Sequence, residues 1–222
     1  MKNWLTVVIP CKNEGESLIR TIESIPEEVD IIVADSSTDT TPELLAQTFP
    51  HVRIVDGGLP AEARNNGANL VQTPYVLFLD ADMDISKVDL NRIILDMIKK
   101  DLDLATCRIS VKSLYGFFYG VFYLVQNLIS GLTPFAVGGF MLFRTETFNV
   151  LGGFDPRDKF AEDYHLSMKI DSERFRIYQM PAYTSDRRLR KKSVWYMVKH
   201  MTLCWFNRNN PSFYQKDHGY WK

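Results

Sequence analysis

Tyr75-Val76-Leu77-Phe78-Leu79-Asp80-Ala81-Asp82 is the stretch of sequence that decides the fold. Its first five residues are apolar and follow Pro74, which predicts a buried strand. Carboxylates directly after such a strand lie where a parallel sheet opens onto a crevice, and they are costly there unless they meet a cation or the hydrogen bonds of a loop. Oxygen ligands without nearby His or Cys favour Mg²⁺ or Mn²⁺. We therefore expect Asp80 and Asp82 to bind a divalent cation beside a nucleotide or another diphosphate, with a turn-forming role as the alternative.

The chain before this stretch alternates between strand and helix patterns. Apolar runs predict strands at residues 5–9, 31–34 and 51–55. Helical spacing predicts helices at residues 16–22, after an N-cap at Asp39 or Thr40, and at residues 61–70. This alternation is typical of a doubly wound, mostly parallel sheet flanked by helices, so we expect a single α/β domain.

After Asp84 the pattern continues and then changes character. A predicted helix at residues 88–100 and a strand at residues 104–111 precede residues 113–129, an uncharged apolar and aromatic segment. A membrane-spanning helix needs about 20 apolar residues, and Gln126 and Asn127 interrupt the segment before that length. We expect an interfacial or buried helical insertion rather than a span.

Two glycine pairs follow this segment. Gly138-Gly139 precedes a predicted strand at residues 140–143. Gly152-Gly153-Phe154-Asp155 predicts a turn before a helix that carries Glu162-Asp163 near its start. A helix N-terminus stabilises an ionised carboxylate, which suits a catalytic base, although many such acids are only helix-start charges. The neighbouring His165 is expected to pack or to face solvent rather than to act in catalysis.

Composition narrows the class of protein. The 222 residues carry a formal net charge of −1, which argues for neither nucleic-acid binding nor disorder. Three cysteines in no metal-binding spacing indicate neither a disulfide framework nor a zinc site, so a reducing, cytoplasmic setting is expected. The first residues enter a strand at once and lack the regions of a signal peptide, so we expect no export.

The charges are unevenly distributed near the C-terminus. From Arg187 to Lys216 there is no acid, but there are several Lys and Arg residues and aromatic residues such as Trp195, Trp205 and Phe206. We expect residues 187–222 to form a basic, aromatic extension. Together with residues 113–129 it suits an anionic membrane surface; a core helix and an ordinary solvated face are the alternative.

Two further polar groups are predicted to lie at the strand ends. Asp35 ends the second predicted strand and can accept hydrogen bonds from a base or ribose, or can merely cap and turn the chain. Arg64, in Ala63-Arg64-Asn65-Asn66-Gly67, can reach a phosphate or a base carbonyl, or can belong to a solvated helix face. Neither residue decides between its two interpretations alone.

The order of these motifs resembles the family-2 glycosyltransferases of GT-A fold, which use a nucleotide-diphosphate sugar and invert the anomeric carbon. The resemblance spans roughly residues 5–190 and rests on the following pieces in order: Val8-Ile9-Pro10-Cys11-Lys12-Asn13-Glu14, Ala34-Asp35-Ser36-Ser37-Thr38-Asp39, Ala63-Arg64-Asn65-Asn66-Gly67, Leu79-Asp80-Ala81-Asp82, Gly138-Gly139, Gly152-Gly153-Phe154-Asp155 and Glu162-Asp163. Two departures matter. The family usually has adjacent acids where this chain has Ala34 then Asp35, and the Gln-x-x-Arg-Trp signature of processive synthases is absent, which argues against a polymer-extruding enzyme.

The resemblance implies a role for each matched residue. The nucleotide and donor site would comprise Pro10, Asn13, Glu14, Asp35, Arg64, Asp80, Ala81 and Asp82. Asp82 would be the principal ligand of Mn²⁺ or Mg²⁺, with Asp80 beside it, and Asp163 would be the catalytic base. The acceptor side would comprise Gly138, Gly139, Glu162, Arg187 and Arg188.

The resemblance also implies the domain organisation. Residues 1–186 would form the GT-A domain, with a nucleotide-binding half at residues 1–84 and an acceptor half at residues 85–186.

We therefore expect an inverting hexosyltransferase that moves a sugar from a UDP- or GDP-linked donor to a lipid-linked, glycan or other membrane-proximal acceptor. It would act as a peripheral protein on the cytoplasmic face of the membrane, without nucleic acid. The alternatives are a polyprenyl-phosphate sugar synthase of the dolichyl-phosphate mannose or glucose type and a catalytically silent nucleotide-sugar binding subunit. A nucleotidylyltransferase would need a Gly-rich, basic phosphate loop after the first strand, and residues 11–14 are not one.

Overall fold

The computed structural model describes residue 1, residues 3–216 and residue 218, apart from the side chain of Arg188. Seven strands form one sheet in the order β3-β2-β1-β4-β6-β5-β7. The strands are β1 Leu5–Cys11, β2 Asp30–Asp35, β3 Arg53–Asp56, β4 Tyr75–Leu79, β5 Leu104–Ser110, β6 Phe140–Arg144 and β7 Phe175–Tyr183. All neighbouring pairs are parallel except those of β6, which runs antiparallel to β4 and β5. The expected doubly wound, mostly parallel α/β sheet is confirmed.

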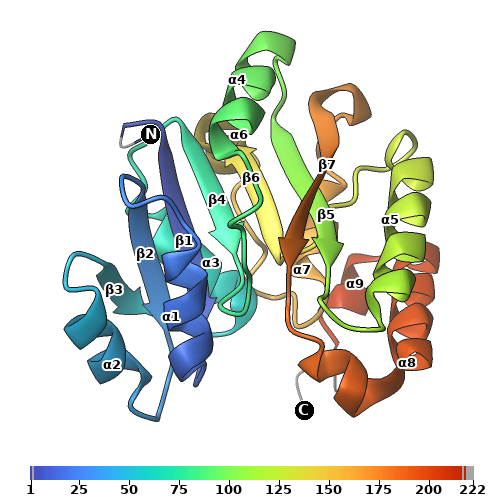
Figure 1. Cartoon of the computed structure of the whole chain (residues 1–222). Coiled ribbons are helices and arrows are strands. Elements are labelled where there is room, and N and C mark those ends of the chain that lie inside the picture. The colour runs from blue at the N-terminus through green and yellow to red at the C-terminus, as the bar shows by residue number, and fades with distance from the viewer. Residues whose placement is uncertain (2, 217, 219–222) are drawn as a thin grey trace.

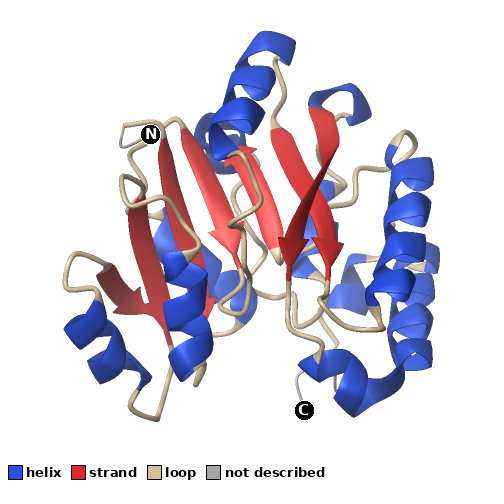
Figure 2. Ribbon diagram, in the orientation of Figure 1, coloured by secondary structure: helices blue, strands red, loops and turns tan. Residues whose placement is uncertain are grey.

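Helices cover both faces of this sheet (Figures 1 and 2). They are α1 Gly15–Glu23, α2 Thr41–Thr48, α3 Pro60–Ala68, α4 Leu90–Lys100, α5 Gly116–Ser130, α6 Thr145–Val150, α7 Glu162–Ser167, α8 Arg187–Phe206 and α9 Pro211–Tyr214, with a 3₁₀ turn at Ser172–Arg174. The elements whose bounds were predicted from sequence agree with the observed ones within a few residues, whereas β7, α6, α8 and α9 were not predicted. The first strand is the clearest exception, because it continues through Pro10 to Cys11, where it pairs with Asp35 of β2.

The period of two in β4 explains why this strand sits at the centre of two cores. Leu77 and Leu79 face the core that α1, α2 and α4 cover, whereas Val76 and Phe78 face the core that α3, α6 and α7 cover. All five residues of β4 are buried. A run of apolar residues without alternation is therefore required, as for other strands covered on both faces.

A third, smaller core lies beside the sheet. Phe160, Tyr164, Cys204, Phe213 and Tyr214 form it, so that α7, α8 and α9 pack together. Helix α8 contains a non-helical residue, Ser193 at φ 59°, which separates two helical segments. Within the described residues, no helix combines the length and apolar character that crossing a bilayer demands.

Candidate active site

The polar residues singled out in the sequence meet at one edge of the sheet, because β1, β2 and β4 are parallel and end there. Asp35 ends β2, Asp80 follows β4, and the turn after β1 carries Asn13 and Glu14. The sheet therefore places residues from three separate sequence motifs at one of its edges. Three local arrangements make up the site.

The first arrangement is centred on Arg64 of α3. Its Nη2 donates to Asp80 Oδ1 at 2.8 Å, and its Nη1 donates to Glu162 Oε1 at 2.5 Å. Arg64 and Glu162 are both buried, whereas Asp80 is partly exposed. A buried arginine with two carboxylate partners is not a solvated helix face, which removes the alternative considered for Arg64. It joins the acid after β4 to the acid pair of α7.

Asp163 lies beside this guanidinium and is held by backbone donors. Its Oδ2 accepts from the Gly138 N–H at 2.6 Å, and its Oδ1 accepts from the Tyr164 N–H at 2.7 Å. Burial raises the pKa of Asp163, and it raises the pKa of Glu162 as well; Arg64 opposes both shifts. The start of a helix was expected to favour the ionised acid. Desolvation has the larger effect on the pKa here, because α7 has only six residues.

A turn held by Asn65 sets the chain leading to α7. The Asn65 amide donates to the Phe154 carbonyl at 2.7 Å and accepts from the Phe154 N–H at 3.0 Å. Gly153 adopts φ 71°, a conformation that favours glycine. Asn65 and the Gly152-Gly153 turn, which are far apart in sequence, thus form one structural unit.

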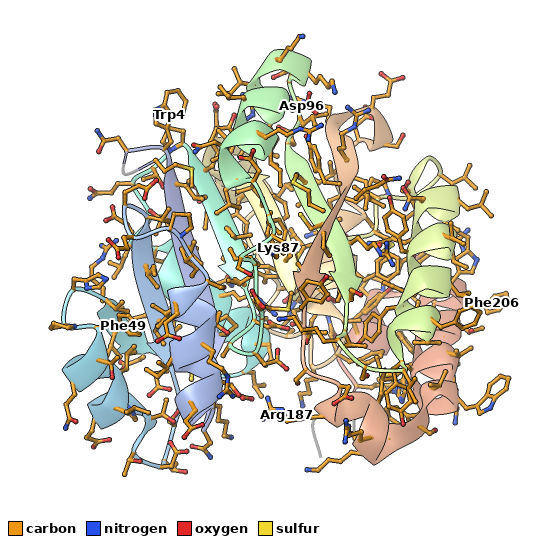
Figure 3. All side chains as sticks on the ribbon, viewed as in Figure 1. Trp4, Phe49, Lys87, Asp96, Arg187 and Phe206 are labelled. Atoms are coloured by element: carbon orange, nitrogen blue, oxygen red, sulfur yellow. The ribbon has the colours of Figure 1, made fainter. Side chains whose placement is uncertain are left out.

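The second arrangement surrounds Asp82. Ser185 Oγ donates to Asp82 Oδ2 at 2.5 Å, and Thr184 Oγ1 lies 3.4 Å from Asp82 Oδ1. Arg187 Nη2 lies 3.6 Å from Asp82 Oδ2 and donates to Glu14 Oε2 at 2.6 Å. Arg187 was placed on the acceptor side from sequence; in the structure it contacts two carboxylates predicted for the donor side. It lies at the lower edge of Figure 3, between α1 and α8.

Thr184 and Ser185 were missed by sequence reasoning. They belong to the segment after β7, and the sequence gives no local signal that this segment returns to a carboxylate about 100 positions earlier. An open cavity of about 490 Å³ adjoins them and Asp82. Asp82 is therefore accessible from solvent although two hydroxyls contact it.

The third arrangement links the turn that follows β1 to the turn that follows β2. Asp35 Oδ1 accepts from the backbone N–H of Ser37 at 3.2 Å and from its Oγ at 2.6 Å. Ser37 Oγ in turn accepts from the Asn13 N–H at 2.7 Å, and Asn13 adopts φ 56°. Asp35 therefore has the local turn role considered for it, and the residue remains partly exposed.

The remaining predicted residues occupy supporting positions. Pro10 lies within β1, and Ala81 is buried with its carbonyl accepting from Thr21 Oγ1 at 2.9 Å. A Cβ on Gly139 would meet Met83 Sδ at 3.2 Å. Arg188 belongs to α8, and its side chain lies outside the described residues. His165 pairs with Asp158 and stacks on Tyr214, which confirms the expected packing role.

The carboxylates around Asp82 fit a divalent cation of the kind expected. Their donor atoms are carboxylate oxygens. Burial is the main cause that raises the pKa of Glu14; Arg187 opposes the shift, and the charges of Asp82 and Asp80 add to it. Among the described residues no group of three or more His, Cys, Asp or Glu side chains could hold a metal ion alone. Mg²⁺ commonly binds through one or two carboxylates together with substrate phosphates, which matches this incomplete set.

Comparison with known proteins decides the family. The profile described as "Glycosyl transferase family 2" matches residues 6–152. The chain belongs to glycosyl transferase family 2. The uncharacterized glycosyltransferase YibD of Escherichia coli (strain K12) is 31% identical over 115 residues, which cover 47% of this chain and 33% of YibD. This family-2 chain thus matches only about a third of that relative's length.

Two solved structures share the fold. The mannosyltransferase PcManGT from Pyrobaculum calidifontis, in complex with GDP-Man and Mn²⁺, superposes with a TM-score of 0.67 at 22% identity, covering 91% of this chain and 64% of that one. TarS residues 1–349 from S. aureus, in complex with UDP-GlcNAc, gives a TM-score of 0.62 at 18% identity, covering 83% and 59%. The fold of this family-2 protein is therefore of GT-A type.

Proposed function

We propose that this family-2 glycosyltransferase is a metal-dependent, inverting hexosyltransferase with a UDP- or GDP-linked donor and a lipid-linked or other membrane-proximal acceptor. The single observation that carries the proposal is the Arg64 guanidinium, which contacts both Asp80 and Glu162. It joins the carboxylates expected at the donor diphosphate to those expected at the acceptor. The GDP-Man bound by PcManGT and the UDP-GlcNAc bound by TarS support the choice of donor class, and the Mn²⁺ in the PcManGT structure supports the choice of metal.

The donor would bind along the ends of β1, β2 and β4. Asp35 and the Asn13 turn, which follow β2 and β1, would contact the base and ribose, and Asp80 and Asp82, which follow β4, would flank the diphosphate. Asp82, with Asp80, would hold Mn²⁺ or Mg²⁺. When bound, that ion would neutralise charge on the departing diphosphate.

Asp163 would act as the base. A sugar hydroxyl is a poor nucleophile at neutral pH, so its proton must pass to a carboxylate as the oxygen attacks the anomeric carbon. The new C–O bond forms while the bond to the diphosphate breaks on the opposite face, and the single displacement inverts the centre. The Gly138 and Tyr164 N–H groups fix the Asp163 carboxylate, and Arg64 favours its ionised form.

A polyprenyl-phosphate acceptor is the second candidate, and Arg108 favours it. Arg108 lies near the end of β5, its guanidinium is 5.7 Å from the Tyr123 ring of α5, and its buried Nε has no hydrogen-bond partner among the described residues. A cation with unused donors suits an anionic acceptor. A phosphate oxygen is already ionised, so this reaction would not need Asp163 as a base.

The Asp163→Asn variant tests these roles. We expect it to bind the donor with unchanged affinity and to lose about 10²- to 10⁴-fold in transfer to a hydroxyl acceptor, as measured by single-turnover product formation. Glu173→Gln, a change of an exposed acid in the 3₁₀ turn, is the matched control. Full transfer to a hydroxyl acceptor by the Asn variant would refute the base role, and unchanged transfer confined to a phosphate acceptor would select the second candidate. Donor binding without transfer in the wild type would indicate the silent subunit.

We also propose that the protein works on the cytoplasmic face of the membrane as a peripheral protein. The uncharged segment of α5 and the basic segment of α8 support the association with a membrane.

A further inference from the structure

Helix α5 presents an apolar stripe to solvent. Leu124 and Leu128 are 67% and 81% exposed. Exposed helix faces usually carry charged residues, whereas α5 has none. The other exposed apolar residues of α5, Phe117, Val121 and Val125, lie three or four positions apart around them, and the exposed Leu114 and Leu132 flank the two ends of the helix. This spacing defines one continuous helix face. The opposite side, with Phe122 and Gln126, is buried.

The second half of α8 also has an amphipathic outer face. Trp195, Lys199, Thr202 and Phe206 are exposed at spacings of four, three and four residues, which places them on one face of the helix. Trp195 and Phe206 are 80% and 77% exposed. His200 and Cys204 on the inner side are buried. Large aromatic side chains on this outer face are therefore not needed for the core.

Both helices rest on the same aromatic core. Phe122 of α5 contacts Phe135, and Phe135 contacts Tyr164 and packs against the cluster that contains Cys204 of α8. The helices lie at the same edge of the molecule, and Phe206 projects outward there (Figures 1 and 3). We call the exposed apolar residues of 114–132 together with Trp195, Lys199 and Phe206 the α5–α8 surface.

This surface concentrates the exposed apolar side chains. Among the described residues, more than half of the large hydrophobic side chains that are exposed belong to it, and the rest, such as Trp4, Leu95 and Val150, are scattered over other elements. Scattered exposed apolar residues are normal for a folded protein, whereas a contiguous patch marks an interaction site.

The charges beside the apolar stripe point to the partner. No acidic residue occurs at 113–145, and none at 187–216, where Lys191 and Lys199 are exposed. Two copies of the chain meeting face to face through this surface would bring like charges together without acids to pair with them. An anionic lipid surface supplies the opposite charge and a low-dielectric layer for the aromatic and aliphatic side chains.

We infer that the α5–α8 surface docks on an anionic lipid bilayer, with the α5 stripe, Trp195 and Phe206 inserted at the headgroup level and Lys199 at the charged headgroups. The inference rests on the proposed function because a lipid-linked acceptor would reach the protein from the bilayer on which this surface docks. Helix α5 is the main membrane anchor in this inference, and the basic extension adds to it. The docking itself needs neither donor nor metal.

The test is co-sedimentation of the full chain, without nucleotide, with vesicles of phosphatidylcholine alone or mixed equally with phosphatidylglycerol. We expect binding to the anionic vesicles. A combined Phe117→Ser, Leu124→Ser, Leu128→Ser variant should lower the partition coefficient at least about 100-fold, since each side chain loses its transfer free energy. Lys199→Gln should lower it about fivefold on anionic vesicles only.

A matched control carries Trp4→Ser, Leu95→Ser and Val150→Ser, which remove exposed apolar side chains outside the surface. It should sediment with vesicles like the wild type. Equal sedimentation of the α5 triple variant and the wild type would overturn the inference, as would a dimer without lipid that only the α5 variant abolishes. A thermal shift with nucleotide, measured on the same proteins, separates this outcome from failure of the proposed function. Wild-type protein that shows a nucleotide shift but does not bind vesicles would contradict only the docking surface. Wild-type protein that binds vesicles but shows no nucleotide shift would contradict only the donor assignment.

Discussion

The Arg64 guanidinium donates to the Glu162 carboxylate at 2.5 Å, and both side chains are buried. Because Arg64 also contacts Asp80, one positive charge compensates acids from two motifs that are 82 positions apart. Breaking a buried pair by removing one partner leaves an uncompensated charge, which costs far more than breaking a surface pair. Arg64 is therefore both a structural element and the link between the two halves of the site.

Arg64→Gln should lower the free energy of unfolding by about 3 kcal/mol at pH 8, because Glu162 loses its partner. The loss should shrink at pH 5, where the Glu162 carboxyl, whose pKa burial already raises, takes up a proton. Urea denaturation at the two pH values measures both effects. Arg20→Gln, which breaks an exposed pair with Glu16, is the control and should change stability by less than about 0.5 kcal/mol. Equal losses in the two variants would contradict the buried-pair account.

Gly138→Ala should disturb the base by steric contact alone. A Cβ at this position would lie 2.7 Å from Arg64 Nη2 and 3.2 Å from Asp163 Oδ2, so both groups would have to move. We expect transfer to fall at least about tenfold with little change in donor affinity, since misplacement of a catalytic group by a fraction of an ångström is costly. Steady-state kinetics with a hydroxyl acceptor measures this. Gly131→Ala, where a Cβ would meet nothing within 4 Å, is the control, and equal activities of the two variants would show that this contact is unimportant.

The pH dependence of transfer should report the raised pKa of Asp163. Only the ionised carboxylate accepts a proton, so log(kcat/KM) should fall with decreasing pH along a limb that lies above the ordinary aspartate value of 3.8. A group with a raised pKa in the folded state costs stability as the pH rises through that pKa. Unfolding measurements should accordingly show the Asp163→Asn variant gaining stability relative to wild type from pH 4 upward. A fall in log(kcat/KM) only at or below pH 3.8, with no gain in stability of Asp163→Asn relative to wild type, would exclude a desolvated base.

The sequence predicted this edge of the sheet because the signals are local. The apolar run of β4 and the acids after it adjoin in sequence, and parallel strands bring Asp35 and Asp80 to the same edge whatever the loops do. The partners of those acids could not be predicted. Arg187 contacts Glu14 across 173 positions, and Glu162 of α7 is buried against Arg64 of α3 across 98 positions. Side-chain desolvation follows from such long-range packing, so the raised pKa of Asp163 could not be predicted from the sequence.

Arg187→Ala should strengthen binding of Mn²⁺ in the absence of nucleotide. The Arg187 guanidinium lies 3.6 Å from Asp82 and pairs with Glu14, so it repels a cation at the same carboxylates. Exposed pairs contribute at most about 1 kcal/mol, which predicts up to about fivefold tighter binding by calorimetry. Arg190→Ala, which removes an exposed pair with Asp186, should leave Mn²⁺ binding unchanged. Weaker Mn²⁺ binding in the Arg187 variant would mean that the residue supports the metal site instead of opposing it.

The most direct measurement is a thermal-shift panel of UDP, GDP and their sugar conjugates, each with and without Mn²⁺, on wild type, Asp82→Asn and Asp163→Asn. We predict stabilisation of the wild type by one nucleotide class only when Mn²⁺ is present, worth about 2.7 kcal/mol at a ligand concentration of 100 Kd. Asp82→Asn should lose the Mn²⁺ requirement together with most of the shift, and Asp163→Asn should keep both. No shift of the wild type with any nucleotide, with or without Mn²⁺, would contradict a nucleotide-sugar donor site at this edge of the sheet.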